Sequence, residues 1–309
     1  MKKIVLWVIV FLVISFCVVK LLPTTKTVSE TVDVDCPIDA LNRNISNPTN
    51  WNKWWPGKKL SNGNYSFHDK EIVIKTFLLN GFTGETQSGG KQIKIDLQAL
   101  TISSYTSQIN LTTQYQFSSN IVTKLVQYIS LLKDKSEFTE FLHQVQTDFS
   151  SLEKTYGFTI ERQKVPNSSY ISVKTSFNHY PTTEEIYFQI HELEKYIELQ
   201  NSKAINAPIL NIHTDNNKEY EAMVAIATDR DLSSNNKYFL KNMMLGNIMV
   251  AEVKGDRKRI DECIQAMKYY ISDYKKSSPA IYFERLITNR LDEKDSTQWV
   301  TTINYPIFN

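Results

Sequence analysis

The sequence predicts an α+β protein with three parts: an N-terminal transmembrane helix, an antiparallel sheet closed by a long helix, and a duplicated β-α-β-β domain. Three observations lead to this prediction. The chain begins with an uncharged run, the next stretch alternates apolar and polar residues, and the C-terminal half shows one helical spacing twice. We therefore expect a transmembrane anchor at 1–22, a linker at 23–28, a first domain at 29–156 and a second domain at 157–309.

The predicted anchor is an uncharged run from Ile4 to Val19, preceded by two lysines. If Lys20 snorkels to the interface, the run is just long enough to cross a bilayer, and the two lysines favour a cytoplasmic N-terminus. The alternative is a cleaved secretory signal, but the bulky Phe16 stands where a lipoprotein signal needs a small residue before Cys17. We expect a single-pass membrane protein with extracytoplasmic C-terminal domains.

Composition and cysteine content narrow the function classes. The 309 residues include 35 Lys and Arg against 33 Asp and Glu, so a net charge of +2 gives no electrostatic case for nucleic acid. The three cysteines, Cys17, Cys36 and Cys263, are too widely spaced to predict a disulfide framework or a zinc site. No nucleophile elbow and no phosphate-binding loop occurs. We expect no metal, no cofactor and no nucleic-acid partner.

The first domain combines strands with one amphipathic helix. Val32 and Val34 alternate with aspartates, as in a half-buried strand. Three further runs alternate in the same way, with turn residues such as Ser88-Gly89-Gly90 between them: Ile72–Thr76, Ile93–Leu97 and Ile109–Thr113. Seven apolar residues then share one helical face: Phe138, Phe141, Leu142, Val145, Phe149, Leu152 and Tyr156. We expect Ser136 to cap the start of this helix and Gly157 to end it.

A short strand, a proline turn and a tryptophan cluster carry a family resemblance. The strand and turn are Val32-Asp33-Val34-Asp35-Cys36-Pro37-Ile38, and the cluster is Trp51, Trp54, Trp55 and Pro56. With the strands and long helix that follow, this order resembles the SRPBCC (START-like, polyketide-cyclase-like) superfamily. The resemblance implies a helix-grip domain, whose curved sheet wraps a long helix around an apolar cavity. Phe138, Phe141, Val145 and Phe149 would face that cavity; alternatively, they fill the core.

The second domain repeats one pattern. Strands are expected at 170–176, 209–213 and 220–228, and again at 248–253, 280–288 and 299–306. The first helix carries Ile186, Ile190, Leu193 and Ile197 on one face; the second carries Ile260, Ile264, Met267, Ile271 and Tyr274. Thr182 and Glu185 form a capping-box pair at the start of the first helix. Two such units imply a pseudo-twofold domain, because one unit cannot cover its own sheet.

The second unit of this repeat also carries a family resemblance. It rests on Val253-Lys254-Gly255-Asp256, on Pro279-Ala280-Ile281-Tyr282-Phe283-Glu284-Arg285-Leu286-Ile287-Thr288-Asn289, and on Gln298-Trp299-Val300-Thr301-Thr302-Ile303-Asn304-Tyr305-Pro306-Ile307. These segments look like the GyrI-like domain, the effector-binding domain of AraC-type regulators. The resemblance implies a small-molecule pocket with aromatic walls and a buried acid. Glu284 matches that acid, Trp299 matches the motif tryptophan, and Tyr282 shares a strand face with Glu284. Thr302 replaces an acid of the family pattern, which weakens the case for a cationic ligand.

These observations favour a protein that binds a small hydrophobic or amphipathic molecule, as a sensor or carrier at the cell envelope. One alternative is a hydrolase of small electrophilic compounds that uses Glu284 as a general base. Another is a non-catalytic interaction module with filled cavities, in which Glu284 is a surface carboxylate paired with Arg285 or Lys268. A pocket lined by Glu284, Tyr282 and Trp299, with Thr302 nearby, would favour binding or hydrolysis. An exposed Glu284 and a Trp299 packed in the core would favour the interaction module.

Overall fold

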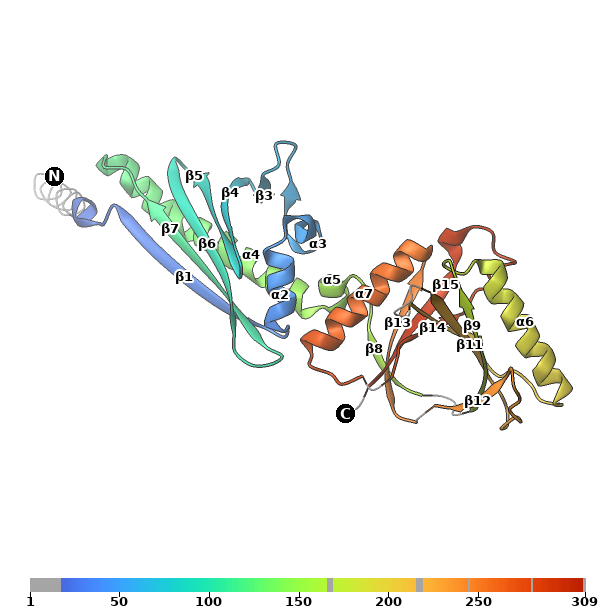
Figure 1. Ribbon diagram of the computed structural model, residues 1–309. Helices are drawn as coiled ribbons and strands as arrows, with labels where there is room; N and C mark the ends of the chain where they lie inside the picture. Colours follow the sequence, from blue (N-terminus) through green and yellow to red (C-terminus); the bar gives the residue numbers. More distant parts are fainter. Residues whose placement is uncertain (1–17, 166–168, 215–218, 244, 279, 308–309) are drawn as a thin grey trace, which may run out of the picture. The chain divides into compact units, whose positions relative to one another are not determined.

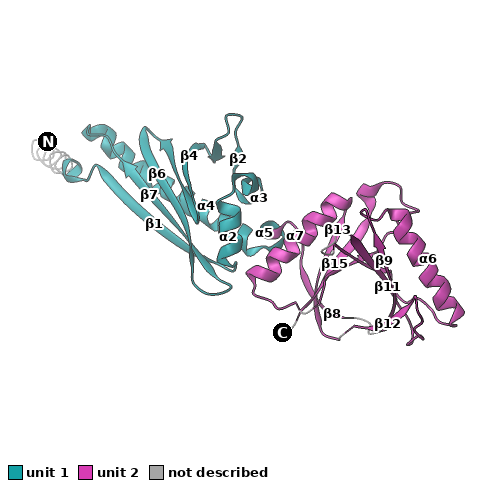
Figure 2. Cartoon of the chain, viewed as in Figure 1, with its two compact units in different colours: residues 1–155 teal, residues 156–309 magenta. Residues whose placement is uncertain are grey.

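The chain divides into two compact α+β units, residues 1–155 and 156–309 (Figure 2). The computed structural model describes residues 18–165, 169–214, 219–243, 245–278 and 280–307 (Figure 1). Each unit contains one curled antiparallel sheet with helices against it, so the predicted α+β class holds.

The structure corrects the prediction of an N-terminal transmembrane helix and of a single-pass protein with extracytoplasmic domains. Among the described residues, no helix is both long enough and apolar enough to cross a membrane. Residues 1–17, most of the predicted anchor, lie outside the described residues. The described remainder is helical only from Val18 to Leu21, about one turn, and strand β1 starts at Thr25. The described residues thus give no support to the prediction that the membrane is a partner.

The first unit is built on a seven-stranded antiparallel sheet in the order β1-β7-β6-β5-β4-β3-β2. Its strands are β1 (Thr25–Val34), β2 (Lys58–Lys59), β3 (Tyr65–Phe67), β4 (Lys70–Leu78), β5 (Gly81–Ser88), β6 (Lys91–Thr101) and β7 (Ser107–Gln116). Strands β5 and β6 meet in a two-residue turn at Gly89 and Gly90. Both glycines have positive φ, which this tight hairpin requires and which a side chain would disfavour.

The helices of this unit are α2 (Ile38–Ile45), η1 (Pro48–Asn50), α3 (Trp51–Trp54), α4 (Ile121–Ser150) and α5 (Leu152–Tyr156). Helix α4 is longer than predicted. Asn120 caps its start by accepting a hydrogen bond from the Thr123 backbone, so Ser136 is an interior residue and its predicted role as the cap is wrong. The predicted apolar face from Phe138 to Phe149 is buried. Gly157, with φ of 81°, follows the short α5 rather than the long helix.

The second unit contains an eight-stranded antiparallel sheet in the order β12-β9-β11-β10-β14-β15-β13-β8. Its strands are β8 (Glu161–Lys164), β9 (Ser169–Phe177), β10 (Ile209–Thr214), β11 (Tyr220–Ala227), β12 (Phe239–Asn242), β13 (Asn247–Lys254), β14 (Phe283–Leu286) and β15 (Val300–Ile307). Its helices are α6 (Thr183–Leu199), α7 (Arg257–Asp273) and η2 (Ser296–Gln298). The pattern β-β-α-β-β occurs twice along the chain, and the strand order reads equivalently from either edge.

Helices α6 and α7 pack on one face of this sheet, which we call the outer face; the opposite face is the inner face (Figure 1). The predicted capping box of Thr182 and Glu185 is present at the start of α6. Asp256 caps α7 by accepting a hydrogen bond from the Arg259 backbone, and Gly255 precedes it with φ of 148°. A Cβ at Gly255 would lie 2.8 Å from the Arg259 Cβ, so the turn into α7 requires glycine.

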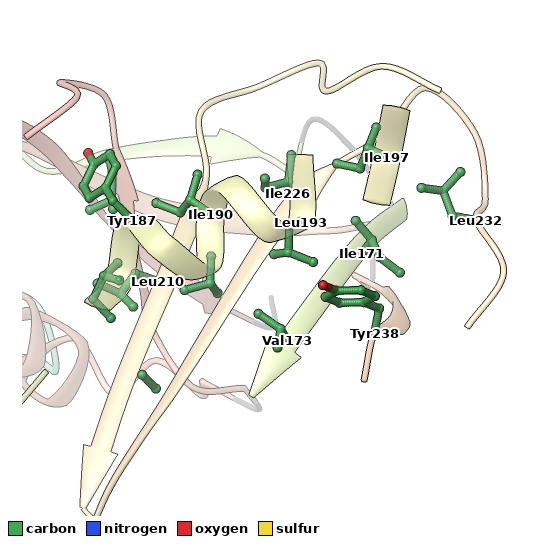
Figure 3. Packing of buried hydrophobic residues seen from close by; sticks show 14 residues of the cluster. Ile171, Val173, Tyr187, Ile190, Leu193, Ile197, Leu210, Ile226, Leu232 and Tyr238 are labelled. Atoms are coloured by element: carbon green, nitrogen blue, oxygen red, sulfur yellow. The ribbon is translucent and has the colours of Figure 1, made fainter. Parts of the chain in front are cut away.

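The outer face is closely packed beneath α6. Alternate residues of the strands, such as Ile171 and Val173, meet Ile190 and Leu193 of the helix (Figure 3). The complete cluster contains 14 buried hydrophobic residues from β9, β10, β11, β14, α6 and the loop before β12. Burial of this size supplies most of the free energy that holds a helix on a sheet.

Candidate functional site

The inner face of the second unit encloses a cavity of about 540 Å³. This volume lies within the range of small-molecule sites in proteins. The cavity is lined by Tyr170, Lys174, Ile209, Asn211, Met223, Ala225, Lys241, Asn242, Met243, Leu245, Gly246, Asn247, Ala280, Ile281, Tyr282, Phe283, Pro306 and Ile307. The lining therefore comes from both halves of the duplicated unit.

The cavity walls are mainly apolar. Ile209, Ala225 and Phe283 are buried and belong to a cluster on the inner face. Their strands place them there together, because Ile209 and Ala225 are cross-strand partners and cross-strand partners share a face. At the margin, the apolar side chains of Leu245 and Ile281 remain 69% and 58% exposed. Apolar walls that continue into an exposed apolar margin suit a ligand that enters from solvent.

A buried polar side chain, that of Asn211, projects from this mainly apolar wall. Asn211 lies two residues after Ile209 on β10, so it faces the cavity, and it is only 3% exposed. Its Nδ2 donates a hydrogen bond to the Tyr282 carbonyl at 2.8 Å. Its Oδ1 accepts no hydrogen bond from the described residues. The wall thus presents a buried hydrogen-bond acceptor.

The described lining of the cavity carries few charged side chains, and these are positive. Lys174 and Lys241 are the charged side chains among its described lining residues, which include no carboxylate. Lys174 Nζ donates to Glu221 Oε1 at 2.7 Å, which neutralises it at the surface. The cavity therefore lacks the buried acid that the GyrI-like resemblance implies.

Glu284, the predicted acid, lies on the other side of the sheet. It pairs across β10 and β14 with Leu210, which belongs to the cluster beneath α6, so it faces the helices. It is buried, and its Oε1 lies 2.6 Å from Arg257 Nη1 while its Oε2 lies 3.7 Å from Arg290 Nη2. The predicted alternative, a surface carboxylate paired with Arg285 or Lys268, does not occur either.

The pKa values of Arg257 and Arg290 are shifted in opposite directions. Burial lowers the pKa of Arg290, and the Glu284 carboxylate opposes this shift without cancelling it. Burial also lowers the pKa of Arg257, but hydrogen bonds to Asp261 and the charge of Glu284 more than compensate, so this pKa lies above its ordinary value. Glu284 is held in an internal ion-pair cluster with both arginines.

The other predicted site residues do not gather around Glu284 in a pocket. Tyr282 lines the cavity, and its ring stacks on Tyr305 at 5.3 Å. Trp299 donates its indole N–H to the Glu293 carbonyl at 2.9 Å, and the Arg290 guanidinium lies 4.8 Å from its ring centroid.

Thr302 lies on the face of the sheet opposite to the face of Glu284. It is the cross-strand partner of Arg285, the next residue after Glu284, and adjacent strand residues point to opposite faces. Of the four predicted site residues, Tyr282 therefore lines the cavity, Glu284 and Trp299 contact Arg290, and Thr302 does neither.

Where the resemblance implies a cavity in the first unit, the described aromatic side chains pack against one another. Trp51 stacks on Trp55 at 5.2 Å and meets Phe82 at 4.8 Å, and the indole N–H groups of the tryptophans donate to backbone carbonyls. Trp54 packs on Phe149 at 5.2 Å. The space beside Phe138 measures about 10 Å³. That is about the volume of one water-sized probe, so in this region the aromatic side chains fill the core.

Sequence inspection missed the residues that shape the actual cavity. Asn211 is flanked by Leu210 and Ile212, and a lone polar residue in such a strand usually marks a solvent-facing position. Phe283 lies in the segment that resembles GyrI-like domains, but the resemblance implies a binding role for its neighbour Glu284. The alternation of the strands could have placed them on the inner face. Asn211 is one residue from Leu210 and Phe283 is three residues from Leu286, and both leucines face the helices.

Comparisons with known proteins found similar solved structures with low sequence identity and low TM-score. No protein-family model and no curated protein matches the chain. A chain of the EcmrR–DNA complex is 11% identical with a TM-score of 0.43, over 62% of this chain and 85% of that chain. SAV2435, solved bound to tetraphenylphosphonium, is 15% identical with a TM-score of 0.34, over 49% of this chain and 94% of that chain.

A hydrolase from Listeria innocua is similar to the same degree. It is 8% identical with a TM-score of 0.37, over 48% of this chain and 92% of that chain. At these identities and TM-scores, the likeness carries no argument about activity or ligand. The GyrI-like and SRPBCC-like resemblances remain resemblances of sequence.

Proposed function

We propose that the second unit of this chain binds a small, mostly apolar molecule in the inner-face cavity, as a sensor or carrier of that molecule. The observation that supports the proposal is a cavity of about 540 Å³ with apolar walls and an exposed apolar margin. Burying apolar ligand surface there contributes roughly 25 cal/mol per Å², so the binding energy would come mainly from the walls.

The hydrolase alternative has less support from the same geometry. A general base needs a free lone pair and access to the substrate. Glu284 faces away from the cavity and is paired with Arg257 and Arg290. The filled interaction module also has less support, because the inner face of the second unit contains a cavity of about 540 Å³.

The test is a titration of the full chain with Nile red, a neutral apolar dye whose fluorescence rises in apolar surroundings. We expect saturable binding of one dye per chain. Ala225→Trp places a large side chain in the cavity and should weaken binding at least about tenfold, or 1.4 kcal/mol.

The matched control is Leu199→Trp, which adds the same side chain at a position on α6 that is 79% exposed. This variant should bind the dye like the wild type. Absence of saturable binding by the folded wild-type chain, or equal binding by the Ala225→Trp variant, would contradict the proposed function.

A further inference from the structure

The wall of the inner-face cavity contains a polar atom whose hydrogen-bonding capacity is incompletely used. The Asn211 amide is oriented by its Nδ2, which donates to the Tyr282 carbonyl at 2.8 Å. With Nδ2 so engaged, Oδ1 is the atom left over, and among the described residues nothing donates to it. A buried acceptor without a donor is costly and uncommon in folded proteins.

The neighbours of Asn211 on the sheet do not supply this donor. Its cross-strand partner on β11 is Met223, whose side chain has no N–H or O–H group. Met223 in turn pairs with Lys174 on β9, and the ammonium group of Lys174 donates to Glu221. Oδ1 is thus without a donor among the described residues and is available to a donor group on a ligand in the cavity.

We propose that the cavity selects neutral, mostly apolar molecules that carry a hydroxyl or N–H donor, and that Asn211 Oδ1 accepts the hydrogen bond from that donor. This proposal rests on the proposed binding function and specifies its ligand class. The donor is neutral because the described part of the cavity lining offers no carboxylate to offset a buried cation, and burying an uncompensated charge is unfavourable. Long-chain alcohols and alkylphenols have this chemistry.

The experiment compares two ligands of nearly equal size that differ in the donor. Para-octylphenol carries a hydroxyl group, and para-octylanisole carries a methyl ether in its place. Each displaces Nile red from the full chain, and the displacement curves give the two affinities. We expect the phenol to bind at least about fivefold more tightly, since a ligand that leaves a buried acceptor unpaired loses about 1 kcal/mol or more.

Variants of two asparagines locate the effect. In Asn211→Leu the acceptor is removed, so the preference for the phenol should disappear while the anisole binds at least as well as in the wild type. Asn242→Leu is the matched control, because Asn242 also lines the cavity but is exposed on β12. It should keep the preference.

A second ligand pair tests the charge. Decanol should bind more tightly than decylammonium, whereas tighter binding of the ammonium would overturn the neutral class. Equal affinities of the phenol and the anisole for the wild type would overturn the role of Asn211, while the proposed function stands. That comparison needs no variant, so it holds even if Asn211→Leu fails to fold. If Nile red and all four ligands fail to bind, the proposed function itself fails.

Discussion

The two faces of the sheet in the second unit are occupied in opposite ways. The outer face has α6 and α7 against it, a cluster of 14 buried hydrophobic residues and the internal ion pairs of Glu284. The inner face has a cluster of seven buried hydrophobic residues, and beside it the cavity of about 540 Å³. Strands that alternate apolar residues toward both faces can thus provide a core on one side and a binding surface on the other.

This difference teaches where to look for function in such a unit. The residue with the strongest motif, Glu284, lies on the packed face and contributes to structure. On the open face, Asn211 belongs to no motif, and Phe283 stands in the motif segment only as the neighbour of Glu284. The assignment of function to the inner face can be tested by substitutions whose expected effects differ between the faces.

The largest effect is expected from Glu284→Ala. The substitution leaves the buried Arg290 without its carboxylate partner, which typically costs about 3–5 kcal/mol of unfolding free energy. Urea denaturation measures this loss, and Nile red affinity of the folded variant should stay within about twofold of the wild type. The control is Glu252→Ala, an exposed glutamate on β13, which should cost less than about 0.5 kcal/mol. Equal stabilities of the two variants would refute the structural role of Glu284.

A smaller effect is expected from two alanines on β11. Ala222 belongs to the packed outer cluster, whereas Ala225 lines the cavity. Ala222→Leu should cost about 1–3 kcal/mol of unfolding free energy, because extra methylenes strain a filled core. Ala225→Leu should cost less than that, since its side chain enters open space. Thermal and urea unfolding of both variants checks the contrast, and a similar cost for both would remove the distinction between the faces.

The smallest effect concerns Cys263 on α7, which is fully buried against the outer face. Burial raises the pKa of its thiol from 9.0 to about 12. Because the folded pKa is the higher one, the thiol's stabilising contribution is complete below pH 9 and declines as the pH rises towards 12. Between pH 9 and pH 10, the unfolding free energy should fall by about 1 kcal/mol relative to that of Cys263→Ala.

The same thiol offers a chemical check of packing. At pH 8 the native chain should resist alkylation at Cys263, as judged by mass spectrometry of its peptides, and should react after denaturation in urea. Alkylation of native Cys263 at that pH would show that α7 does not cover the outer face closely.

Sequence periodicity predicted the helices of the second unit well, because their apolar stripes face the sheet directly. Ile186, Ile190 and Ile197 of α6 are buried at the predicted spacing. Sequence periodicity failed in the first half of α4, where polar residues are buried and apolar residues are exposed. There Lys124, Gln127 and Asp134 are buried, whereas Val122 and Leu132 are 72% and 75% exposed, so the helix start was placed too late.

The reversal in α4 has a local cause that no periodicity shows. Asp134 lies 2.6 Å from Lys91 of β6 and 3.4 Å from Lys70 of β4, and both lysines are buried in the first unit. Partners on distant strands allow polar residues to face inwards. A stripe of polar residues on a helix therefore predicts an exposed face only when the opposite wall is apolar.

The candidate site was the hardest feature to predict. Alternation predicted one shared face for Tyr282 and Glu284, but Tyr282 precedes β14 and lines the inner-face cavity, whereas Glu284 faces the helices. The partners that occupy Glu284 come from elsewhere: Arg257 starts α7 and Arg290 follows β14. Their approach depends on the tertiary fold, so spacing in the sequence gives no indication of it.

The edge strands of the second unit are exchanged between its halves, and this has a consequence for folding. Strand β8 precedes the first half but pairs with β13 of the second, and β12 precedes the second half but pairs with β9 of the first. Neither half, expressed as a separate fragment, would have its own outermost strand, and each would expose an unpaired edge. The two halves should therefore unfold in one cooperative transition, and the duplicated unit behaves as an indivisible folding domain.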